Sequence, residues 1–457
     1  MIEGLRPYPD YKETELPWVD RMPSHWSQRR MKFLFHERVQ KGFPNEPLLA
    51  ATQTKGVVRK EDYGERTVTA QKDFHLLKLV EVGDFVISLR SFQGGIEIAH
   101  NRGIISPAYT ILAPKEVVDR SFFANFFKSQ NFINALTLFV TGIREGQNID
   151  YVRLSRAYMP LPPKEEQEKI GRFLFTVNQK INRAIQTKKR LLTLLNEQKQ
   201  TIIHRAVTRG LDPSVPLKPS NIPWLGDIPK HWQVKPLKHW ARINEKTLGI
   251  GTDPEYEFRY FDIGCVGTGR LVHEPEQMKF KNAPSRARRM LRFGDTIIST
   301  VRTYLKAVYF ISSHDENLIA STGFAVLSPR EGVIPEFLTL GIQSPAFIDR
   351  VTANSIGIAY PAIAESRLSS FHLAFPADKK EQEKIVEYVH EKVKPFDKAI
   401  KSVDREVGLL REYKTRLVAD VVTGKLDVRP AAEKLPLVEE EIQEESEDFL
   451  EETADAE

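Results

Sequence analysis

The 457-residue sequence has one cysteine, Cys265, and lacks any uninterrupted apolar run of about 18 residues. A single thiol can form neither an internal disulfide nor a multi-thiolate zinc site, which is typical of a reducing compartment. A bilayer-spanning helix needs about 20 mostly apolar residues. The first residues also lack the basic and then apolar pattern of a signal peptide. We therefore expect a soluble, cytoplasmic protein.

The common catalytic signatures are also missing from the sequence. Neither a Gly-x-x-x-x-Gly-Lys-Ser/Thr phosphate loop nor a His-Glu-x-x-His metal site occurs. Residues 261–269 faintly resemble a glycine-rich cofactor loop, but no clear amphipathic helix follows, which favours a plain turn. Residues 162–164 lack the polar and aromatic neighbours that an amino-methyltransferase motif needs, and residues 376–380 favour a helix start over a nuclease pattern. Because an absent motif is weak evidence, an enzyme remains an open alternative.

The net charge of +5 conceals an uneven distribution of charged residues. From Glu433 onward there are 12 acidic residues and one lysine, so the preceding residues hold 65 Lys and Arg against 49 Asp and Glu. A basic body attracts polyanions, because each cation placed on a phosphate releases condensed counterions. Residues 430–457 are expected to form an acidic, disordered tail. Many basic proteins bind no nucleic acid, so charge alone does not decide the function.

The sequence contains an internal repeat of two similar halves. Residues 17–26 return as residues 223–232, with every proline, tryptophan and histidine retained at a shift of 206. Further correspondences are Gly83-Asp84 with Gly294-Asp295 and residues 166–170 with residues 381–385. The shift grows only from 206 to 215, so each copy is about half of the protein and too long for a solenoid repeat. Two similar modules in one chain predict a pseudo-twofold molecule that reads a target in two parts.

Each copy shows the same order of elements. Strands are predicted after the Gly-Asp pairs, and second strands and short apolar helices are predicted further along. The predicted strands cover residues 85–89 and 108–112 in the first copy and residues 296–299 and 324–327 in the second. The predicted helices cover residues 122–132 and 335–348. The modules are therefore of the mixed α+β class.

A long charged segment with a helical period closes each copy. Apolar residues recur at steps of three and four over residues 174–202 and 385–421, as in a coiled-coil seam, with Lys188 and Lys199 at two seam positions. One such helix cannot bury its stripe alone, so the two segments are predicted to pack on each other. The alternative is that each helix lies across its own globular domain. Pro395 is expected to kink or break the second helix.

Four prolines punctuate the crossing between the copies and predict a linker. They are Pro213, Pro216, Pro219 and Pro223. The tryptophans of the two openings are interpreted as core anchors, because they repeat with fixed prolines; platforms for base stacking are the alternative. These tryptophans are Trp18, Trp26, Trp224 and Trp232.

Together these features resemble the specificity (S) subunits of type I restriction-modification systems. The resemblance rests on the opening at residues 224–232, the Gly-Asp strand starts, the Pro-Leu-Pro-Pro run at residues 160–163 and the Glu-Gln-Glu-Lys-Ile helix starts, and it spans about residues 16–428. It implies an α+β fold with two similar target-recognition domains, separated by an antiparallel coiled coil of two long helices. The implied parts are an N-terminal extension (1–15), the first recognition domain (16–163), the first long helix (164–209), the linker (210–222), the second recognition domain (223–378), the second long helix (379–425) and the tail (430–457).

The same resemblance implies a function and partners. Each recognition domain would bind one half of a bipartite duplex DNA target, and the coiled coil would set the spacing and dock two adenine methyltransferase (M) subunits. Restriction (R) subunits would join in the full complex. The resemblance implies no catalytic centre, cofactor or metal in this chain, because the partner subunits would bind S-adenosylmethionine, ATP and magnesium.

Donor-rich loops in each copy are the candidate DNA-reading segments. Arginine can bind guanine O6 and N7 with two hydrogen bonds, and Asn or Gln can do the same to adenine. The candidates are Arg90, Ser91, Gln93, Asn101, Arg144, Gln147 and Asn148 in the first copy and Arg302, Thr303, Tyr304, Lys306 and Tyr360 in the second. For each of them ordinary surface solvation is the alternative. A second basic cluster, which would bind phosphates without specifying sequence, consists of Arg286, Arg288, Arg289 and Arg292.

Two other functions remain open from the sequence alone. A protein-interaction scaffold would present two modules on a coiled-coil spacer and bind no DNA. A fused nuclease or methyltransferase would act on DNA by itself. A comparison of specific and random duplexes separates DNA recognition from the scaffold.

Overall fold

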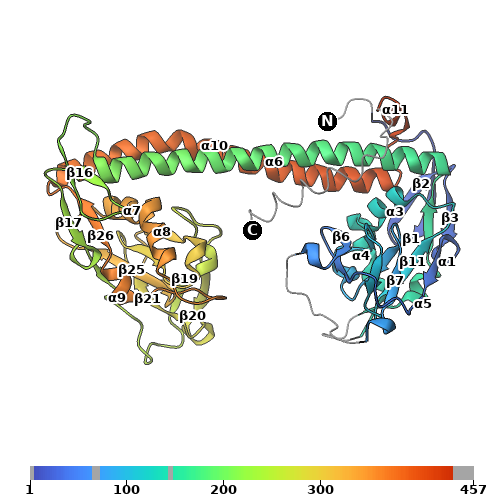
Figure 1. Cartoon of the computed structure of the whole chain (residues 1–457), viewed down its shortest axis with the longest axis horizontal. Helices are drawn as coiled ribbons and strands as arrows, with labels where there is room; N and C mark the ends of the chain where they lie inside the picture. Colours follow the sequence, from blue (N-terminus) through green and yellow to red (C-terminus); the bar gives the residue numbers. More distant parts are fainter. Residues whose placement is uncertain (1–4, 64–72, 143–147, 436–457) are drawn as a thin grey trace. The chain divides into compact units, whose positions relative to one another are not determined.

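The computed structural model describes residues 5–63, 73–142 and 148–435, and Figure 1 shows the chain coloured along its sequence. The structure divides into two compact units. Unit 1 comprises Met1–Lys188 with Glu406–Glu457, and unit 2 comprises Lys189–Arg405. Each unit contains one globular domain and a part of each long helix, α6 (Lys164–Arg209) and α10 (Lys379–Val422).

A four-stranded antiparallel sheet lies at the centre of unit 1. Its strands follow the order β4 (Phe35–Arg38), β11 (Thr110–Pro114), β8 (Phe85–Ile87) and β9 (Glu97–Ile98). Val86 pairs with Ile111 and Phe85 with Leu112 across β8 and β11. The two strands predicted for the first copy are thus confirmed, because short apolar runs bounded by turns form buried strands.

The other strands described in unit 1 form two-stranded pairs. These are β1 (Tyr11–Leu16) with β2 (Val19–Pro23), β3 (Ser27–Arg30) with β14 (Tyr158–Leu161), β5 (Leu49–Thr52) with β6 (Gly56–Arg59), β7 (Lys78–Val80) with β10 (Gly103–Ile105), and β12 (Val140–Thr141) with β13 (Asn148–Ile149). The β3–β14 pair leads the chain directly into α6.

Two helices, not one, occupy residues 122–132, so this prediction is corrected. They are α3 (Arg120–Phe127) and α4 (Gln130–Leu136). The break lies at Ser129, whose hydroxyl donates to Phe126 O (2.7 Å) and accepts the Phe132 N–H (3.4 Å). A serine in this position caps a new helix start and ends the preceding one. The centre of the core is aromatic and consists of Phe35, Phe85, Phe122, Phe123, Phe126 and Phe127.

Unit 2 repeats the central sheet of unit 1. Its strands follow the order β18 (Ala241–Ile243), β25 (Phe324–Pro329), β22 (Thr296–Ser299) and β23 (Val308–Phe310), which confirms the predicted duplication. The predicted helix over residues 335–348 is also two helices, α7 (Pro335–Gln343) and α8 (Pro345–Ala353). Ser344 separates them as Ser129 does, with its hydroxyl donating to Gly341 O (2.7 Å).

Unit 2 also contains a second four-stranded sheet. Its strands are β20 (Glu276–Lys279), β19 (Glu257–Phe261), β24 (Leu318–Ser321) and β21 (Ala287–Leu291), of which β19 and β24 are parallel. Strand β17 (Gln233–Pro236) also pairs with β26 (His372–Phe375). Short helices include α9 (Glu365–Ser369) in unit 2 and α1 (Met31–Leu34), α2 (Ser91–Gly94) and α5 (Tyr151–Leu154) in unit 1. Among the residues that the structure describes, no helix combines the length and apolarity needed to cross a bilayer.

In unit 1 the first part of α6 packs antiparallel on the last part of α10. Lys414 Nζ donates to Asn182 Oδ1 (2.8 Å), and Lys188 pairs with Glu406. As the residue number rises along α6, the number of its partner on α10 falls, so the two helices are antiparallel. The apolar seam residues buried in this part are Val177, Ile181, Val407, Leu417 and Val421.

In unit 2 the last part of α6 packs on the first part of α10 in the same sense. Lys199 Nζ pairs with Asp397 Oδ1 (2.6 Å), and Ile203 shares a core cluster with Ile385. The predicted pairing of the two helices is confirmed, and each predicted seam lysine meets an acid of the other helix. The start of α6 also lies on its own domain, because Phe173 belongs to the core of unit 1.

Helix α10 continues through Pro395, so the expected break is corrected. Proline removes one backbone donor and crowds the carbonyl four residues earlier, which here belongs to Glu391. Both Pro395 and Glu391 are exposed, so water can reach that carbonyl. Val393 and Val403 on either side of the proline are buried in the seam, and this packing holds the helix together.

The segment predicted to be a linker belongs partly to unit 2. Here β15 (Leu217–Pro219) pairs with β16 (Asp227–Pro229), and Lys218 Nζ donates to Trp232 O (2.7 Å). In unit 1, β1 pairs with β2 and Lys12 Nζ donates to Trp26 O. Each repeat therefore begins earlier than residues 16 and 223. The stretch before these residues contains a lysine common to both copies, Lys12 in the first and Lys218 in the second.

The chain also stays folded past residue 430, where the sequence predicts a disordered tail. Helix α11 (Arg429–Ala432) is described, and Val428 and Ala432 are fully buried in the core of unit 1. These two apolar side chains anchor the turn. The sequence does not reveal it, because two apolar residues are too short a pattern to stand out beside a long acidic segment. Residues 436–457 of the predicted tail lie outside the described residues.

Leu417 and Leu409 both lie on α10 but differ in exposure, 4% against 53%. Leu417→Ala is expected to lower the free energy of unfolding by about 2–5 kcal/mol, because it leaves a cavity in the seam. Leu409→Ala, the matched control, should change it by less than about 0.5 kcal/mol. Urea unfolding followed by circular dichroism measures both values. Equal losses would contradict the described packing of α10.

Candidate nucleic-acid interface

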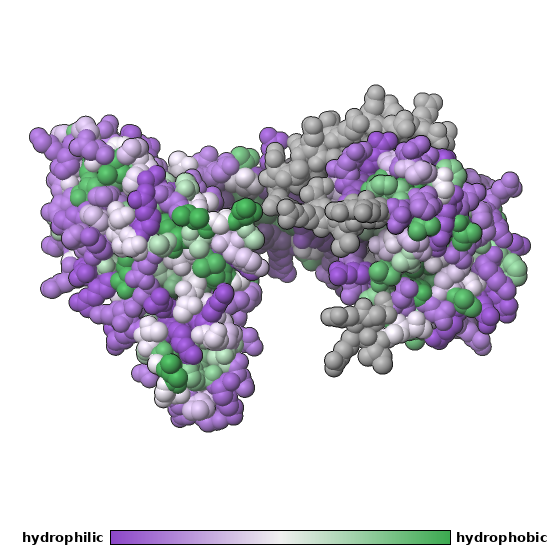
Figure 2. All heavy atoms as spheres, turned by 60° about the horizontal axis from the view of Figure 1, so that its bottom comes forward, coloured by the Kyte–Doolittle hydropathy of each residue, from purple (hydrophilic) through white to green (hydrophobic). Residues whose placement is uncertain are grey.

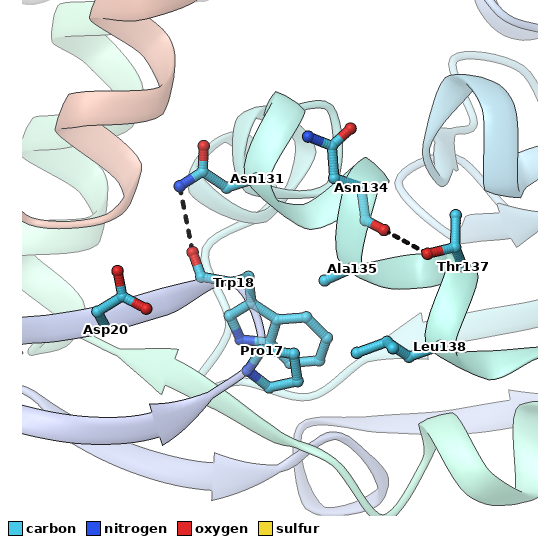
Figure 3. Close-up of a pocket in the computed structure, with 8 residues that line it drawn as sticks. All are labelled: Pro17, Trp18, Asp20, Asn131, Asn134, Ala135, Thr137 and Leu138. Atoms are coloured by element: carbon cyan, nitrogen blue, oxygen red, sulfur yellow. Dashed lines mark hydrogen bonds between the residues drawn. The ribbon is translucent and has the colours of Figure 1, made fainter.

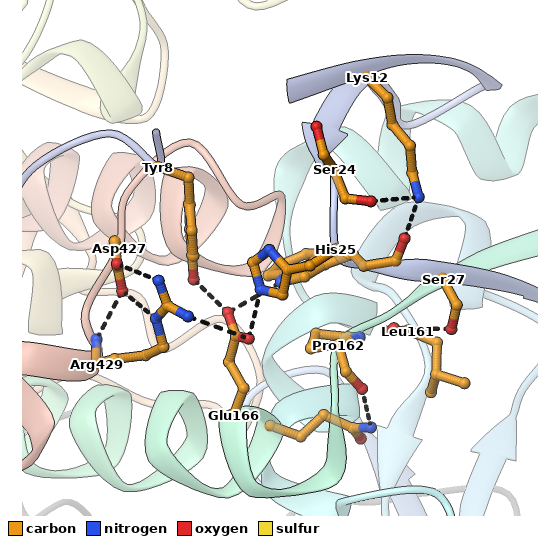
Figure 4. A network of polar contacts seen from close by, with 12 residues as sticks. Tyr8, Lys12, Ser24, His25, Ser27, Leu161, Pro162, Glu166, Asp427 and Arg429 are labelled. Carbon is orange, nitrogen blue, oxygen red and sulfur yellow. Dashed lines mark hydrogen bonds and ion pairs between the residues drawn. The ribbon is translucent and has the colours of Figure 1, made fainter. Parts of the chain in front are cut away.

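A glutamate at the start of each long helix holds the tryptophan opening of its repeat. In unit 1, Glu166 Oε1 accepts hydrogen bonds from Trp26 Nε1 (2.9 Å) and Tyr8 OH (2.7 Å). His25 Nε2 lies 2.8 Å from Glu166 Oε2. Figure 4 shows Tyr8, His25 and Arg429 converging on this carboxylate. The repeated tryptophan openings and the repeated helix starts are therefore two sides of one contact, which we call the glutamate clamp.

Unit 2 contains the same clamp. Trp232 Nε1 donates to Glu381 Oε1 (2.9 Å), and His231 Nε2 lies 2.8 Å from Glu381 Oε2. Trp26 and Trp232 are fully buried, which confirms their interpretation as core anchors. Because the clamp joins a globular domain to its helix, it positions everything that the domain carries.

The glutamine that follows each glutamate tightens this junction. Gln167 Oε1 accepts the Asp119 N–H (2.9 Å), and its Nε2 donates to Pro162 O (2.9 Å). Gln382 makes the equivalent backbone bonds at 2.8 and 3.0 Å. Both glutamines are buried. The Glu-Gln signature is thus a structural device that fixes the loops around the sheet to the helix start.

Residues near the other end of the chain complete the clamp of unit 1. Arg429 donates twice to Asp427 (2.7 and 2.9 Å) and lies 4.0 Å from Glu166. Gly424 has a φ of +76°, and a side chain there would clash with the tryptophan opening. Burial, together with the hydrogen bond to Glu166, raises the pKa of Tyr8, so its hydroxyl stays protonated and donates. The end of α10 is therefore locked onto the first repeat.

Unit 2 places a strained basic turn between β22 and β23. Arg302 (φ 54°, ψ 49°) and Lys306 (φ 50°, ψ 34°) are both left-handed and flank the single 3₁₀ turn Thr303–Leu305. A non-glycine residue in this region costs about 1–2 kcal/mol. Strained residues of this kind concentrate at functional sites. Strain and positive charge therefore coincide in this turn.

The structure joins the basic turn to the second predicted loop of the same copy. The Arg302 N–H donates to Pro361 O (2.8 Å), and the Arg302 guanidinium lies 4.8 Å from the centre of the Tyr360 ring. Thr303 Oγ1 lies 2.7 Å from Ser355 Oγ. Two candidates that are separate in the sequence thus form one surface.

The predicted residues of unit 2 differ in exposure. Arg302, Tyr304, Lys306 and Tyr360 are exposed. Thr303 is buried and its hydroxyl is engaged within the protein, so it does not face solvent. Lys306 Nζ lies 3.2 Å from Asp349 Oδ1, and an exposed pair of this kind contributes only about 0–1 kcal/mol. A phosphate can therefore replace the aspartate at little cost.

The equivalent turn of unit 1 is α2, between β8 and β9. Arg90 and Gln93 are exposed there. Ser91 is buried, and its Oγ accepts the Ser88 N–H (2.8 Å). Both hydroxyls are therefore engaged within the protein, that of Ser91 in its own turn and that of Thr303 with Ser355 of the neighbouring loop.

The other candidates of the first copy divide between two regions. Helix α2 contacts α4 and β13, which brings the exposed Asn148 next to the turn. Asn101 is half-buried and precedes β10. Arg144 and Gln147 lie outside the described residues. Unit 1 therefore also joins its two candidate loops, although with different side chains.

Residues 26–193 match the family model described as the type I restriction modification DNA specificity domain. The chain is similar to type I restriction-modification specificity subunits. The MjaVIII specificity subunit of Methanocaldococcus jannaschii is 22% identical over 359 residues, which cover 77% of this chain and 81% of that protein. The HindI specificity subunit of Haemophilus influenzae is 28% identical over 161 residues, which cover 34% of this chain and 35% of that protein.

A solved structure shares the fold of this chain. It comes from work on complex assembly and conformational transition of the type I R-M system. The TM-score is 0.59 at 15% sequence identity, and the match covers 88% of this chain and 99% of the other. The predicted α+β fold with two paired long helices is confirmed.

Unit 1 has an open pocket that is separate from the candidate loops. It measures about 490 Å³, and Figure 3 shows Asn131 bonded to the backbone of Trp18 at its side. Its lining residues are Pro17, Trp18, Asp20, Asn131, Asn134, Ala135, Thr137 and Leu138. Of the predicted DNA-reading residues that the structure describes, none lines it. Thr303 and Lys306 line a separate, very small cavity in unit 2, and the exposed candidates form a surface of loops.

The second basic cluster is partly engaged within unit 2. The Arg288 guanidinium lies 4.7 Å from the centre of the Phe280 ring, and Arg292 pairs with Glu245 (2.7 Å). Arg289 is half-buried, whereas Arg286 is exposed. Phosphate binding by this cluster remains a prediction, for which the exposed Arg286 and Arg292 are the candidates.

The motif-like runs of the sequence have structural roles. Ile263–Cys265 forms a 3₁₀ turn, which confirms the plain turn, and burial raises the pKa of the Cys265 thiol to about 12. Lys379 begins α10, and the Asp378 side chain accepts the Lys380 N–H (3.0 Å), which confirms the helix start. In the described ranges no group of three or more His, Cys, Asp or Glu is arranged to hold a metal.

Sequence reasoning missed two exposed isoleucines beside the predicted Tyr360. Ile356 and Ile358 lie in the loop that contacts Arg302. They were not predicted because the candidate residues were chosen for their hydrogen-bonding groups, and no periodic pattern marks the two isoleucines. The alternation of apolar residues with glycine and alanine over residues 356–360 is the signal that was available.

Removal of the clamp carboxylate should destabilise the two units unequally. Glu166→Ala leaves the buried Trp26 and Tyr8 donors without an acceptor, so the free energy of unfolding should fall by about 2–4 kcal/mol. Glu381→Ala is the matched control. Its side chain is 30% exposed against 5% for Glu166, so water can replace it and the loss should be about 1–2 kcal/mol. Calorimetry on the full chain compares the two variants. A larger loss for Glu381→Ala would contradict this ranking.

Strain and charge at Lys306 can be separated by two substitutions. Lys306→Gly and Lys306→Ala both remove the ammonium group, so both should weaken duplex binding equally. Only glycine adopts the left-handed conformation without cost, so the glycine variant should be more stable than the alanine variant by about 1 kcal/mol. Thermal unfolding and fluorescence anisotropy measure the two effects. Equal stabilities would show that the turn is not strained in solution.

Proposed function

We propose that this chain is the DNA-recognition subunit of a type I restriction-modification complex and that each unit binds one half of a bipartite duplex target. The observation that carries the proposal is the joined pair of loops beside the equivalent strands β8 and β22. Both units present exposed side chains that can bond base edges there, including Arg90 and Arg302. The match of residues 26–193 to the DNA specificity domain favours this function over a protein-interaction scaffold.

The two halves of the target need not be alike. The clamp and the central sheet are common to both units, whereas the turn after β8 is helical and the turn after β22 is strained and basic. Direct readout depends on the side chains presented to the groove. We therefore infer two different half-sites rather than a palindrome.

We further propose that the paired helices set the gap between the half-sites. Spacing between two DNA-contacting modules is set by the protein that connects them. Helices α6 and α10 pair in both units with an apolar seam, as a stiff connection requires.

The partners follow from the same function. We propose that the helices dock two adenine methyltransferase subunits and that restriction subunits join the complex. These partners would bind S-adenosylmethionine, ATP and magnesium. The chain itself would catalyse no reaction and would act in the cytoplasm.

The test begins with the target sequence. Sequencing of methylated bases in cells with the gene intact or deleted identifies the motif. The chain, with its methyltransferase partner, should then bind that duplex more tightly than a scrambled one. The affinity should fall steeply with salt, because phosphate contacts release counterions.

Arg302→Ala should relax selectivity at one position of one half-site by about 1–3 kcal/mol, the contribution of one bidentate base contact. Arg90→Ala, the matched variant in unit 1, should relax the other half-site. Fluorescence anisotropy with duplexes altered at single positions measures both. A uniform loss on all duplexes would indicate phosphate contact, and relaxation of the same half by both variants would contradict the division of the target.

A further inference from the structure

One loop of unit 2 presents apolar side chains to solvent. Ile356 is 85% exposed, Ile358 is fully exposed and Tyr360 is 60% exposed. Figure 2 shows apolar residues reaching the surface of unit 2 as separate green areas among hydrophilic ones. Single exposed apolar residues are ordinary, but three at alternate positions of one loop suggest a contact surface.

The backbone of this loop is closed on itself and tied to the basic turn. Ile356 and Ala362 exchange two hydrogen bonds (2.8 and 3.0 Å), and the Ile363 N–H donates to Thr300 O (2.9 Å). Gly357 has a φ of +124°, a conformation that other residues rarely adopt. These backbone bonds fix the conformation of the loop that carries Ile358 at its tip.

The surroundings of the tip are cationic. The Arg302 guanidinium covers the Tyr360 ring, and Lys306 lies on the same turn. Arg367 donates to Asn354 Oδ1 (2.9 Å) at the base of the loop. An apolar tip between cations matches duplex DNA, in which phosphates flank the base edges. The apolar group on a base edge of the major groove is the C5-methyl of thymine.

We propose that Ile358, supported by Ile356, reads a thymine of the unit 2 half-site through its C5-methyl group. This inference rests on the proposed DNA-recognition function and adds a base identity to it. Burial of one methyl group against a branched side chain corresponds to a discrimination of about three- to fivefold. Arg302 and Lys306 provide the flanking polar contacts.

The test removes the methyl group alone. Each thymine of the half-site is replaced singly by deoxyuridine, and binding to the full chain with its methyltransferase partner is measured by fluorescence anisotropy. The wild type should bind one uracil duplex about three- to fivefold more weakly. Ile358→Ala should bind the thymine and uracil duplexes equally at that position. Ile250→Ala is the matched control, because Ile250 is 96% exposed in the same unit outside both loops; it should discriminate as the wild type does.

Several results would overturn the proposal. A wild type that treats thymine and uracil alike at every position has no methyl contact. Discrimination that survives in Ile358→Ala assigns the contact to another residue. If Ile358→Ala instead weakens binding of the methyltransferase subunit, or quenches 2-aminopurine fluorescence at a base step, the loop is a protein contact or a wedge. Failure of the wild type to prefer its target over a scrambled duplex would count against the proposed function itself, and the anisotropy series shows this separately.

Discussion

A hydrogen bond from a buried tryptophan to the first-turn glutamate of a long helix joins each domain to its helix. The first turn of a helix has free N–H groups and a partial positive charge, so a carboxylate is favourable there. Glu166 uses the same position to accept the indole and phenol donors of its repeat. One side chain therefore stabilises the helix start and orients the domain. A loop that reads base edges needs a support of this kind, because recognition tolerates errors of only about 0.5 Å.

The two repeats divide their residues between support and recognition. The clamp, the order of the central strands and the serine between paired helices are the same in both units. At the turns, the hydroxyl groups of Ser91 and Thr303 both form hydrogen bonds within the protein. The exposed neighbours differ, and unit 2 adds a second sheet. Such a division lets one half-site change without loss of the frame that carries it.

Much of this frame is predictable from the sequence, because it depends on local patterns. The heptad period predicts both long helices and their pairing, and the Gly-Asp pairs predict the central strands. The breaks at Ser129 and Ser344 escape prediction, because apolar residues on both sides of each serine suggest one continuous helix. The hydroxyl of Ser129 caps α4, whereas Ser344 makes no such cap bond and precedes Pro345, the first residue of α8. Pro395 misleads for the opposite reason. A strong local signal is overridden there by buried neighbours on both sides.

The loops are less predictable, because their shape depends on contacts between distant residues. Nothing local indicates that Arg302 contacts Tyr360, or that two left-handed residues are held beside them. Each such residue costs about 1–2 kcal/mol, so the turn keeps its conformation only while the bonds to the 356–362 loop compensate for the strain. A turn ordered before its ligand arrives loses less conformational entropy on binding than a mobile one. The strain in unit 2 is thus compatible with selective binding. In Arg302 the backbone N–H holds the turn in place, and the side chain remains available to the ligand.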